Sequence, residues 1–146
     1  MQLINSIFNW FKKAVPEPKP KNIHTQIGVH FEEVSEMINS LTSKNQDTLG
    51  HLDIAEQALI DLATHLKQNN NVLDIKDEIE LLDALCDQIV TATGVGYMLG
   101  MNLPDALGEV NKSNYSKFVN GEPIFNENLK IMKGPDYFIA NVKPFI

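Results

Sequence analysis

The sequence predicts an all-α fold, a bundle of about four core helices with a short N-terminal amphipathic helix and a small irregular or β-hairpin tail. Apolar residues recur at helical spacing in four long segments. Polar, glycine-containing or proline-containing breaks separate these segments, and short β-prone pieces appear only after residue 119. With 146 residues, the chain fits one domain that can bury a core.

Residues 1–14 form the first expected element, an amphipathic helix. Its apolar residues recur at helical spacing, and Lys12 and Lys13 stand at its C-terminal end, where they suit the helix dipole. Docking on its own domain or on a partner subunit is the favoured interpretation. A position in a membrane interface is the alternative, because aromatic and lysine residues are typical of interfacial helices. Residues 15–22, "VPEPKPKN", predict a proline-rich extended linker.

Residues 23–118 are expected to hold the catalytic domain. Its first helix follows a stripe from Ile27 to Leu41, and the polar "TSKNQDT" ends it. The other predicted helices run from about Leu49 to Lys67, from Asp74 to about Leu99, and from a cap at Asn102 to near Lys117. Residues 119–146 form a tail with short β-prone pieces, expected to pack on the domain or on a partner subunit.

The composition excludes several classes of function. Nineteen acidic residues against twelve Lys and Arg give a formal charge of −7, which argues against binding duplex nucleic acid. The single cysteine, Cys86, rules out an internal disulfide and a multi-cysteine zinc site, and its place in an apolar stripe predicts a core position. No apolar run is long enough for a membrane span, and the N-terminus does not resemble a signal peptide. We expect a cytoplasmic protein.

The stretch "HFEEVSEM" puts three glutamates on one side of the first core helix. Glu33 and Glu36 stand at i, i+3, and Glu32 and Glu36 at i, i+4. Carboxylates this close repel, so they are either exposed to water or neutralised by a cation. They lie roughly opposite the apolar stripe, where a solvated face would also place them. The stretch alone leaves both interpretations open.

A second acidic cluster lies in "EIELLDALCDQIV" on the third core helix. Glu80, Asp83 and Asp87 fall on a narrow strip beside the apolar stripe, so we expect them at the edge of the core. Crowded carboxylates are costly there unless something compensates them. Two antiparallel helices with such acidic pairs can surround Mg²⁺, or Mn²⁺, with oxygen ligands. Neither cluster contains the Glu-x-x-His pairing of di-iron bundles.

These residues carry a family resemblance. "EEVSE" and "ELLD" look like the EExxE and ExxD motif pair of the all-α nucleoside triphosphate pyrophosphohydrolases, the MazG-like superfamily. The block "DALCDQIVTATGVGYMLGMNLPDALGEVNKSNYSKF" and the tail "GEPIFNENLKIMKGPDYF" resemble its phosphoribosyl-ATP-pyrophosphohydrolase-like branch more specifically. The resemblance covers about residues 23–138.

The resemblance implies Mg²⁺-dependent cleavage between the α- and β-phosphates of a nucleoside triphosphate. By position it makes Glu32 a catalytic group that orients water, or a further metal ligand, with Asp87 in support. It also implies dimers or tetramers. The remaining implied roles are metal binding by Glu33, Glu36, Glu80 and Asp83, and substrate binding by Asn114, Lys117, Lys130 and Lys133.

Two features depart from the family pattern. The segment between Glu36 and Glu80 is longer than usual and holds an extra helical pattern, which could be a lid, a dimer contact or a changed pocket. Leu129 stands where the tail commonly has glycine. The remaining candidates have ordinary interpretations. "GVGYMLG" predicts close helix packing rather than a phosphate loop. The four histidines predict surface or partly buried positions and, as the weaker alternative, a substrate contact.

Three functions follow as hypotheses. The first is a Mg²⁺-dependent (d)NTP pyrophosphohydrolase in nucleotide-pool control. The second is a catalytically weak relative that binds a nucleotide without turnover, and the third is an interaction protein in which the acids are only solvated. The complete motif set favours the first, because a binding-only relative could lose a ligand without consequence. The preferred base stays open.

Overall fold

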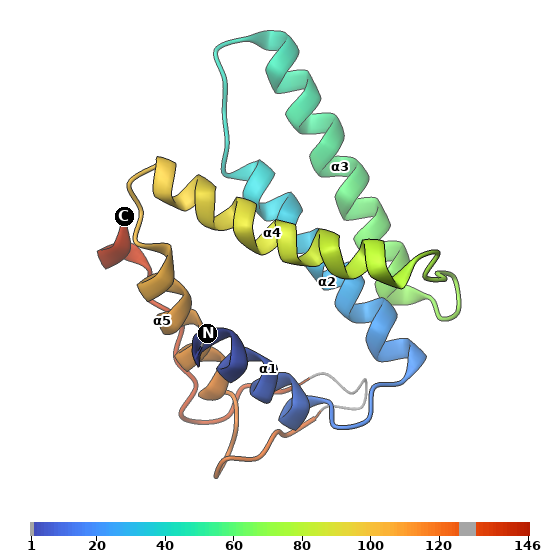
Figure 1. Ribbon diagram of the computed structural model, residues 1–146, viewed down its shortest axis with the longest axis vertical. Helices are drawn as coiled ribbons and strands as arrows, with labels where there is room; N and C mark the ends of the chain where they lie inside the picture. The colour runs from blue at the N-terminus through green and yellow to red at the C-terminus, as the bar shows by residue number, and fades with distance from the viewer. Residues whose placement is uncertain (1, 126–130) are drawn as a thin grey trace. The chain divides into compact units, whose positions relative to one another are not determined.

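A computed structural model describes residues 2–125 and 131–146 of the chain (Figure 1). These residues form five α-helices and a terminal 3₁₀ helix, and their only β-pairing consists of isolated bridges. The all-α prediction is therefore confirmed. The elements are α1 (Gln2–Ala14), α2 (Pro20–Asn39), α3 (Gln46–Gln68), α4 (Glu78–Met98), α5 (Leu103–Tyr115) and η1 (Lys143–Phe145).

The chain divides into two compact units. Unit 1 comprises Met1–Pro16 and Asp77–Ile146, and unit 2 comprises Glu17–Lys76. Unit 1 therefore holds α1, α4, α5 and η1, whereas unit 2 is the α2–α3 hairpin. Among the described residues, no helix has the length and apolarity needed to cross a membrane.

Side-chain caps set the helix boundaries. The Asp77 carboxylate accepts hydrogen bonds from the backbone N–H groups of Ile79 and Glu80, so α4 begins four residues after the predicted start at Asp74. Asn45 caps α3 in the same way, which brings Gln46–Thr48 into the helix. The predicted cap at Asn102 is confirmed, since its side chain accepts from the Asp105 N–H. The linker prediction was wrong at its end, because α2 begins at Pro20, and proline is tolerated in a first helical turn.

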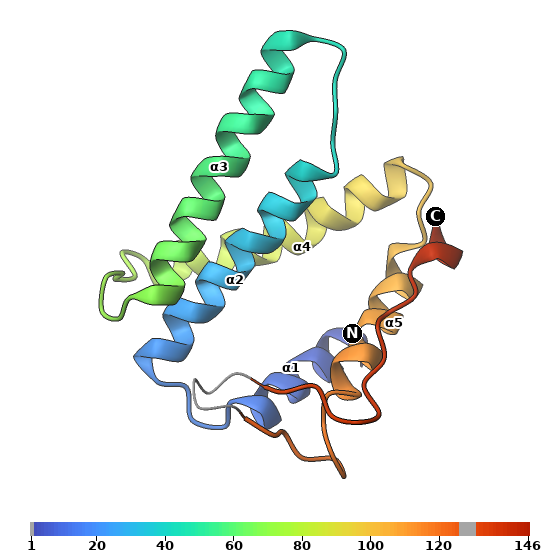
Figure 2. The same cartoon turned by 180° about the vertical axis from the view of Figure 1, so that it is seen from behind.

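In unit 2, α2 and α3 run side by side as an antiparallel hairpin (Figures 1 and 2). The buried positions of α2 are small or polar, namely His24, Gly28 and Ser35. A Cβ atom on Gly28 would lie 2.9 Å from the backbone oxygen of Ala63, so glycine allows the two helices to approach closely. The predicted apolar stripe of α2, which includes Ile27 and Val34, is only half-buried. The helix therefore packs on α3 with a face that its hydrophobic pattern did not identify.

His24 joins α2 to the segment that follows α3. Its Nδ1 lies 2.7 Å from the Pro20 carbonyl oxygen, and its Nε2 accepts from the backbone N–H groups of Val72 and Leu73, each at 3.2 Å. A carbonyl can only accept and an amide N–H can only donate, so this geometry fixes the neutral Nδ1–H tautomer. At 5% exposed, His24 is a buried structural residue, more deeply enclosed than the sequence predicted.

In unit 1, α1 packs against α5. The Trp10 indole N–H donates to the Asn114 carbonyl oxygen at 2.9 Å, and its ring stacks on Phe118 with centroids 5.6 Å apart. Ser6 receives hydrogen bonds from the side chains of Asn111 and Tyr115. The N-terminal helix thus docks on residues of the same chain. Ile4 and Phe8 of this helix stay exposed.

The C-terminal tail folds back on α5. Asn120 and Gly121 both have positive φ and form a tight turn between the bridged residues Val119 and Glu122. Ser113 donates its hydroxyl to the Phe138 carbonyl oxygen at 2.7 Å. At the other end of α5, the Asn102 N–H donates to the Phe145 carbonyl oxygen in η1. Tail and helix are therefore joined at both ends.

Helix α4 has little packing within unit 1. It meets α5 near Gly96, where an added Cβ would lie 3.1 Å from that of Leu103, as expected for close helix packing. Every residue from position 78 to position 93 is exposed, including Ile79 at 80% and Val90 at 66%. Cys86 is exposed too, so its predicted core position was wrong, because no helix of unit 1 covers this stretch.

Candidate functional site

The Glu32 carboxylate is held by a lysine from the neighbouring helix. The Lys67 ammonium lies 2.7 Å from Glu32 Oε1, and both side chains are partly exposed. Lys67 is itself fixed at its backbone, because Lys21 donates to its carbonyl oxygen at 2.8 Å. Part of the repulsion among the α2 glutamates is therefore offset by Lys67, which the sequence analysis did not identify.

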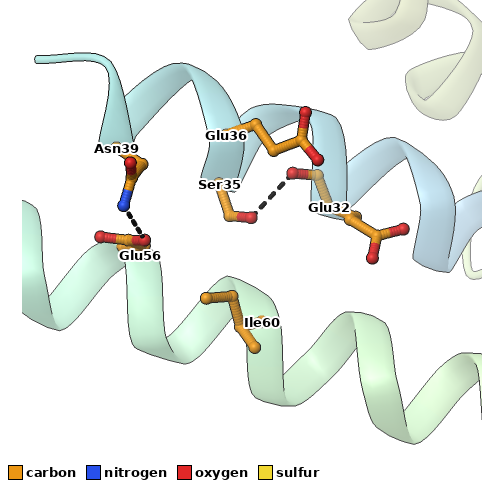
Figure 3. Close-up of a pocket in the computed structure, with 6 residues that line it drawn as sticks. All are labelled: Glu32, Ser35, Glu36, Asn39, Glu56 and Ile60. Carbon is orange, nitrogen blue, oxygen red and sulfur yellow. Dashed lines mark hydrogen bonds between the residues drawn. The ribbon is translucent and has the colours of Figure 1, made fainter.

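A pocket of about 360 Å³ lies between α2 and α3 (Figure 3). Its lining comprises Glu32, Ser35, Glu36 and Asn39 from α2, and Glu56 and Ile60 from α3. Such a volume falls within the range of small-molecule sites. The glutamate face of α2 is therefore not a plain solvated surface, since two of its three glutamates border a hollow.

The pocket is polar at both ends. At one end, the Asn39 amide donates to Glu56 Oε1 at 2.7 Å. In the middle, Ser35 is buried and its hydroxyl donates to the Glu32 carbonyl oxygen at 2.7 Å. In Figure 3, Asn39 and Glu56 point toward one another, whereas the Glu36 carboxylate extends alongside α2 rather than toward α3. Glu36 can therefore serve a ligand at the rim of the pocket.

The predicted metal ligands occupy exposed positions. Glu33 and Glu36 lie one turn apart on α2, and Glu80 and Asp83 one turn apart on α4. The acidic strip of α4 was expected at the edge of a core, but its residues, including Asp87, are exposed together with the apolar stripe beside them. The reason is the absence of a covering helix within unit 1.

Neither unit alone assembles a metal site from its described residues. Within residues 2–125 and 131–146, no three His, Cys, Asp or Glu side chains of one unit lie close enough to hold an ion. The donor chemistry nevertheless suits Mg²⁺, because every candidate is a carboxylate and hard cations prefer oxygen ligands. One helix by itself supplies too few of these carboxylates.

The predicted substrate-binding residues of α5 take part in packing. Lys117 donates to the Asn114 side-chain oxygen at 2.8 Å, and its ammonium lies 5.8 Å from the centre of the Trp10 ring. Lys133 is exposed and lies over the Tyr137 ring at 4.6 Å. Lys130 and Leu129 lie outside the described residues. The structure thus gives the Asn114 and Lys117 side chains defined positions next to α1.

The serines of "SNYSK" connect two segments that carry the family resemblance. Ser113 and Ser116 together hydrogen-bond both backbone groups of Phe138, the last residue of "GPDYF". Gly134 of the same segment passes so close to Val119 that an added Cβ would lie 2.6 Å from its Cγ2. The block and the tail are therefore one packed structure.

Comparisons of the chain with protein-family models, with curated proteins and with solved structures found no match.

Sequence reasoning missed Lys67, Glu56 and Asn39. A partial signal was present: Asn39 follows Glu32 by seven residues and Lys67 follows Glu56 by eleven, so each pair shares a helix face. The register of α2 against α3 decides which of these side chains meet, and no periodicity within one helix gives that register.

Proposed function

We propose that the protein is a Mg²⁺-dependent nucleoside triphosphate pyrophosphohydrolase that converts a (d)NTP to the monophosphate and pyrophosphate in nucleotide-pool control. The observation that carries the proposal is the presence of two acidic pairs, Glu33 with Glu36 on α2 and Glu80 with Asp83 on α4. The all-α fold and the resemblance of the block around α5 support it.

Under this proposal the four carboxylates would hold Mg²⁺, and Asp87, one turn beyond Asp83, would support them. The bound ion supplies positive charge that offsets the triphosphate. Glu32 has one oxygen fixed by Lys67, so its other oxygen can accept a hydrogen bond from the attacking water and orient it. Lysine ammonium groups, such as those of Lys117 and Lys133, would stabilise charge on the departing pyrophosphate.

Incubation of the purified protein with each NTP and dNTP in the presence of Mg²⁺, followed by separation of the products, tests the proposal. We expect equal amounts of monophosphate and pyrophosphate from at least one substrate, and no reaction with excess chelator. Release of orthophosphate with a diphosphate would contradict it. Nucleotide binding without turnover would favour the catalytically weak relative instead.

A further inference from the structure

The Asn39–Glu56 end of the α2–α3 pocket has the chemistry of a nucleobase subsite. Both residues line the pocket, and the hydrogen bond between them uses one Asn39 amide N–H and one Glu56 oxygen. The remaining Glu56 oxygen and the Asn39 carbonyl oxygen are acceptors. Ile60 adds an apolar surface against which a flat ring can pack.

The position along α2 suits a nucleotide. Asn39 lies three residues beyond Glu36, which is about 4.5 Å along the helix axis. A substrate whose phosphates lie near Glu36 can therefore direct its base toward Asn39 and Glu56. Glu56 belongs to α3, the helix within the unusually long segment between the two acidic motifs. The extra helix would thus contribute to base selection.

We infer that this end of the pocket selects bases that bear an exocyclic amino group, namely cytosine, adenine and guanine, over uracil and thymine. Amino groups donate to the acceptors that Glu56 and Asn39 present, whereas uracil and thymine would turn carbonyl oxygens toward a carboxylate. Acceptors facing acceptors leave polar groups unpaired, which costs affinity. This inference rests on the proposed function for the identity of the ligand, but binding alone can test it.

The test uses nucleosides, which carry no phosphate and need no metal. Deoxycytidine, deoxyadenosine, deoxyguanosine, thymidine and deoxyuridine are titrated into the full-length ¹⁵N-labelled protein, and the Asn39 side-chain amide signals are followed by NMR. We expect saturable shifts with the amino-bearing nucleosides, at least about tenfold stronger than with thymidine or deoxyuridine. Equal binding of all five, or no shift at Asn39, would overturn the inference.

Two variants locate the effect. Glu56→Gln keeps an acceptor for Asn39 and adds a donor that can face a carbonyl oxygen, so the preference should fall below about threefold. Asp61→Asn removes the same charge from α3 at a position that does not line the pocket, so it should bind like the wild type. An unchanged preference in Glu56→Gln would overturn the assignment. So would a shift produced by spermidine but by no nucleoside, because the pocket would then be a cation site.

The outcomes separate the two proposals. Selective nucleoside binding without hydrolysis of any triphosphate would leave the subsite in place and refute the proposed reaction. Hydrolysis to monophosphate and pyrophosphate with the same base preference in the wild type and in Glu56→Gln would support the reaction and refute the subsite.

Discussion

The charge of Glu36 distinguishes a metal-binding carboxylate from a solvated one. Glu36→Gln keeps the size of the side chain and removes the charge. If Glu36 binds metal, turnover should fall at least about a hundredfold and the stabilisation by Mg²⁺ should weaken. The melting temperature without metal should stay unchanged or rise, because repulsion from Glu33 is removed. Product assays and thermal melts with and without Mg²⁺ measure these effects.

Glu17→Gln is the matched control for this variant. Glu17 is exposed, lies outside the pocket and precedes α2, so its charge should have little effect on stability or turnover. If Glu36→Gln hydrolyses triphosphates as fast as Glu17→Gln, then "HFEEVSEM" is only a solvated helix face. The metal assignment on α2 would then be wrong.

His24 is the residue whose loss should cost unit 2 most clearly. In His24→Ala, the N–H groups of Val72 and Leu73 lose their acceptor and the buried ring leaves a gap. We expect a loss of about 2 kcal/mol in the free energy of unfolding, measured by denaturant titration. His51→Ala changes an exposed histidine on α3 and should shift stability by less than about 0.5 kcal/mol. Equal effects of the two variants would show that the His24 contacts do not matter.

At the scale of elements, the approach of α2 to α3 makes one substitution have opposite effects at two glycines. Alanine is favoured over glycine within a helix by about 1 kcal/mol. Nothing lies within 4 Å of a Cβ added at Gly50 in α3, so Gly50→Ala should stabilise the protein. At Gly28 the added Cβ meets the Ala63 carbonyl oxygen at 2.9 Å, so Gly28→Ala should destabilise it. Chemical denaturation of both variants measures the difference, and stabilisation by both would contradict the close approach.

The number and type of the helices could be predicted from the sequence, but their buried faces could not. Helical periodicity identifies each long segment, and caps such as Asn102 fix some of the ends. The burial of Gly28 and Ser35 follows from close backbone approach to α3, which hydrophobicity does not encode. The α2 glutamates were identified as a cluster. Their partner Lys67 depends on the register between two helices, so no motif in the sequence reveals it.

At the scale of the whole molecule, α4 shows what one chain leaves uncovered. Leu82 is 65% exposed and Ile89 is 53% exposed, although both lie on the apolar stripe of a long helix. Leu81 and Leu85, to one side of that stripe, are also exposed. Soluble monomers rarely expose a contiguous apolar surface of this extent. We therefore expect surface shared with further copies of the chain, in a dimer or a tetramer.

Light scattering at micromolar concentration tests this expectation. The wild type should have the mass of two or four chains, because burial of apolar surface contributes about 25 cal/mol per Å². Leu85→Glu places a charge on the apolar surface of α4 and should shift the mass toward the monomer. Thr91→Glu adds the same charge at an exposed position whose hydroxyl bonds only to its own helix, so it should leave the mass unchanged. A wild type that is monomeric throughout would refute the shared surface, and equal dissociation by both variants would show that charge alone, rather than loss of apolar contact, separates the subunits.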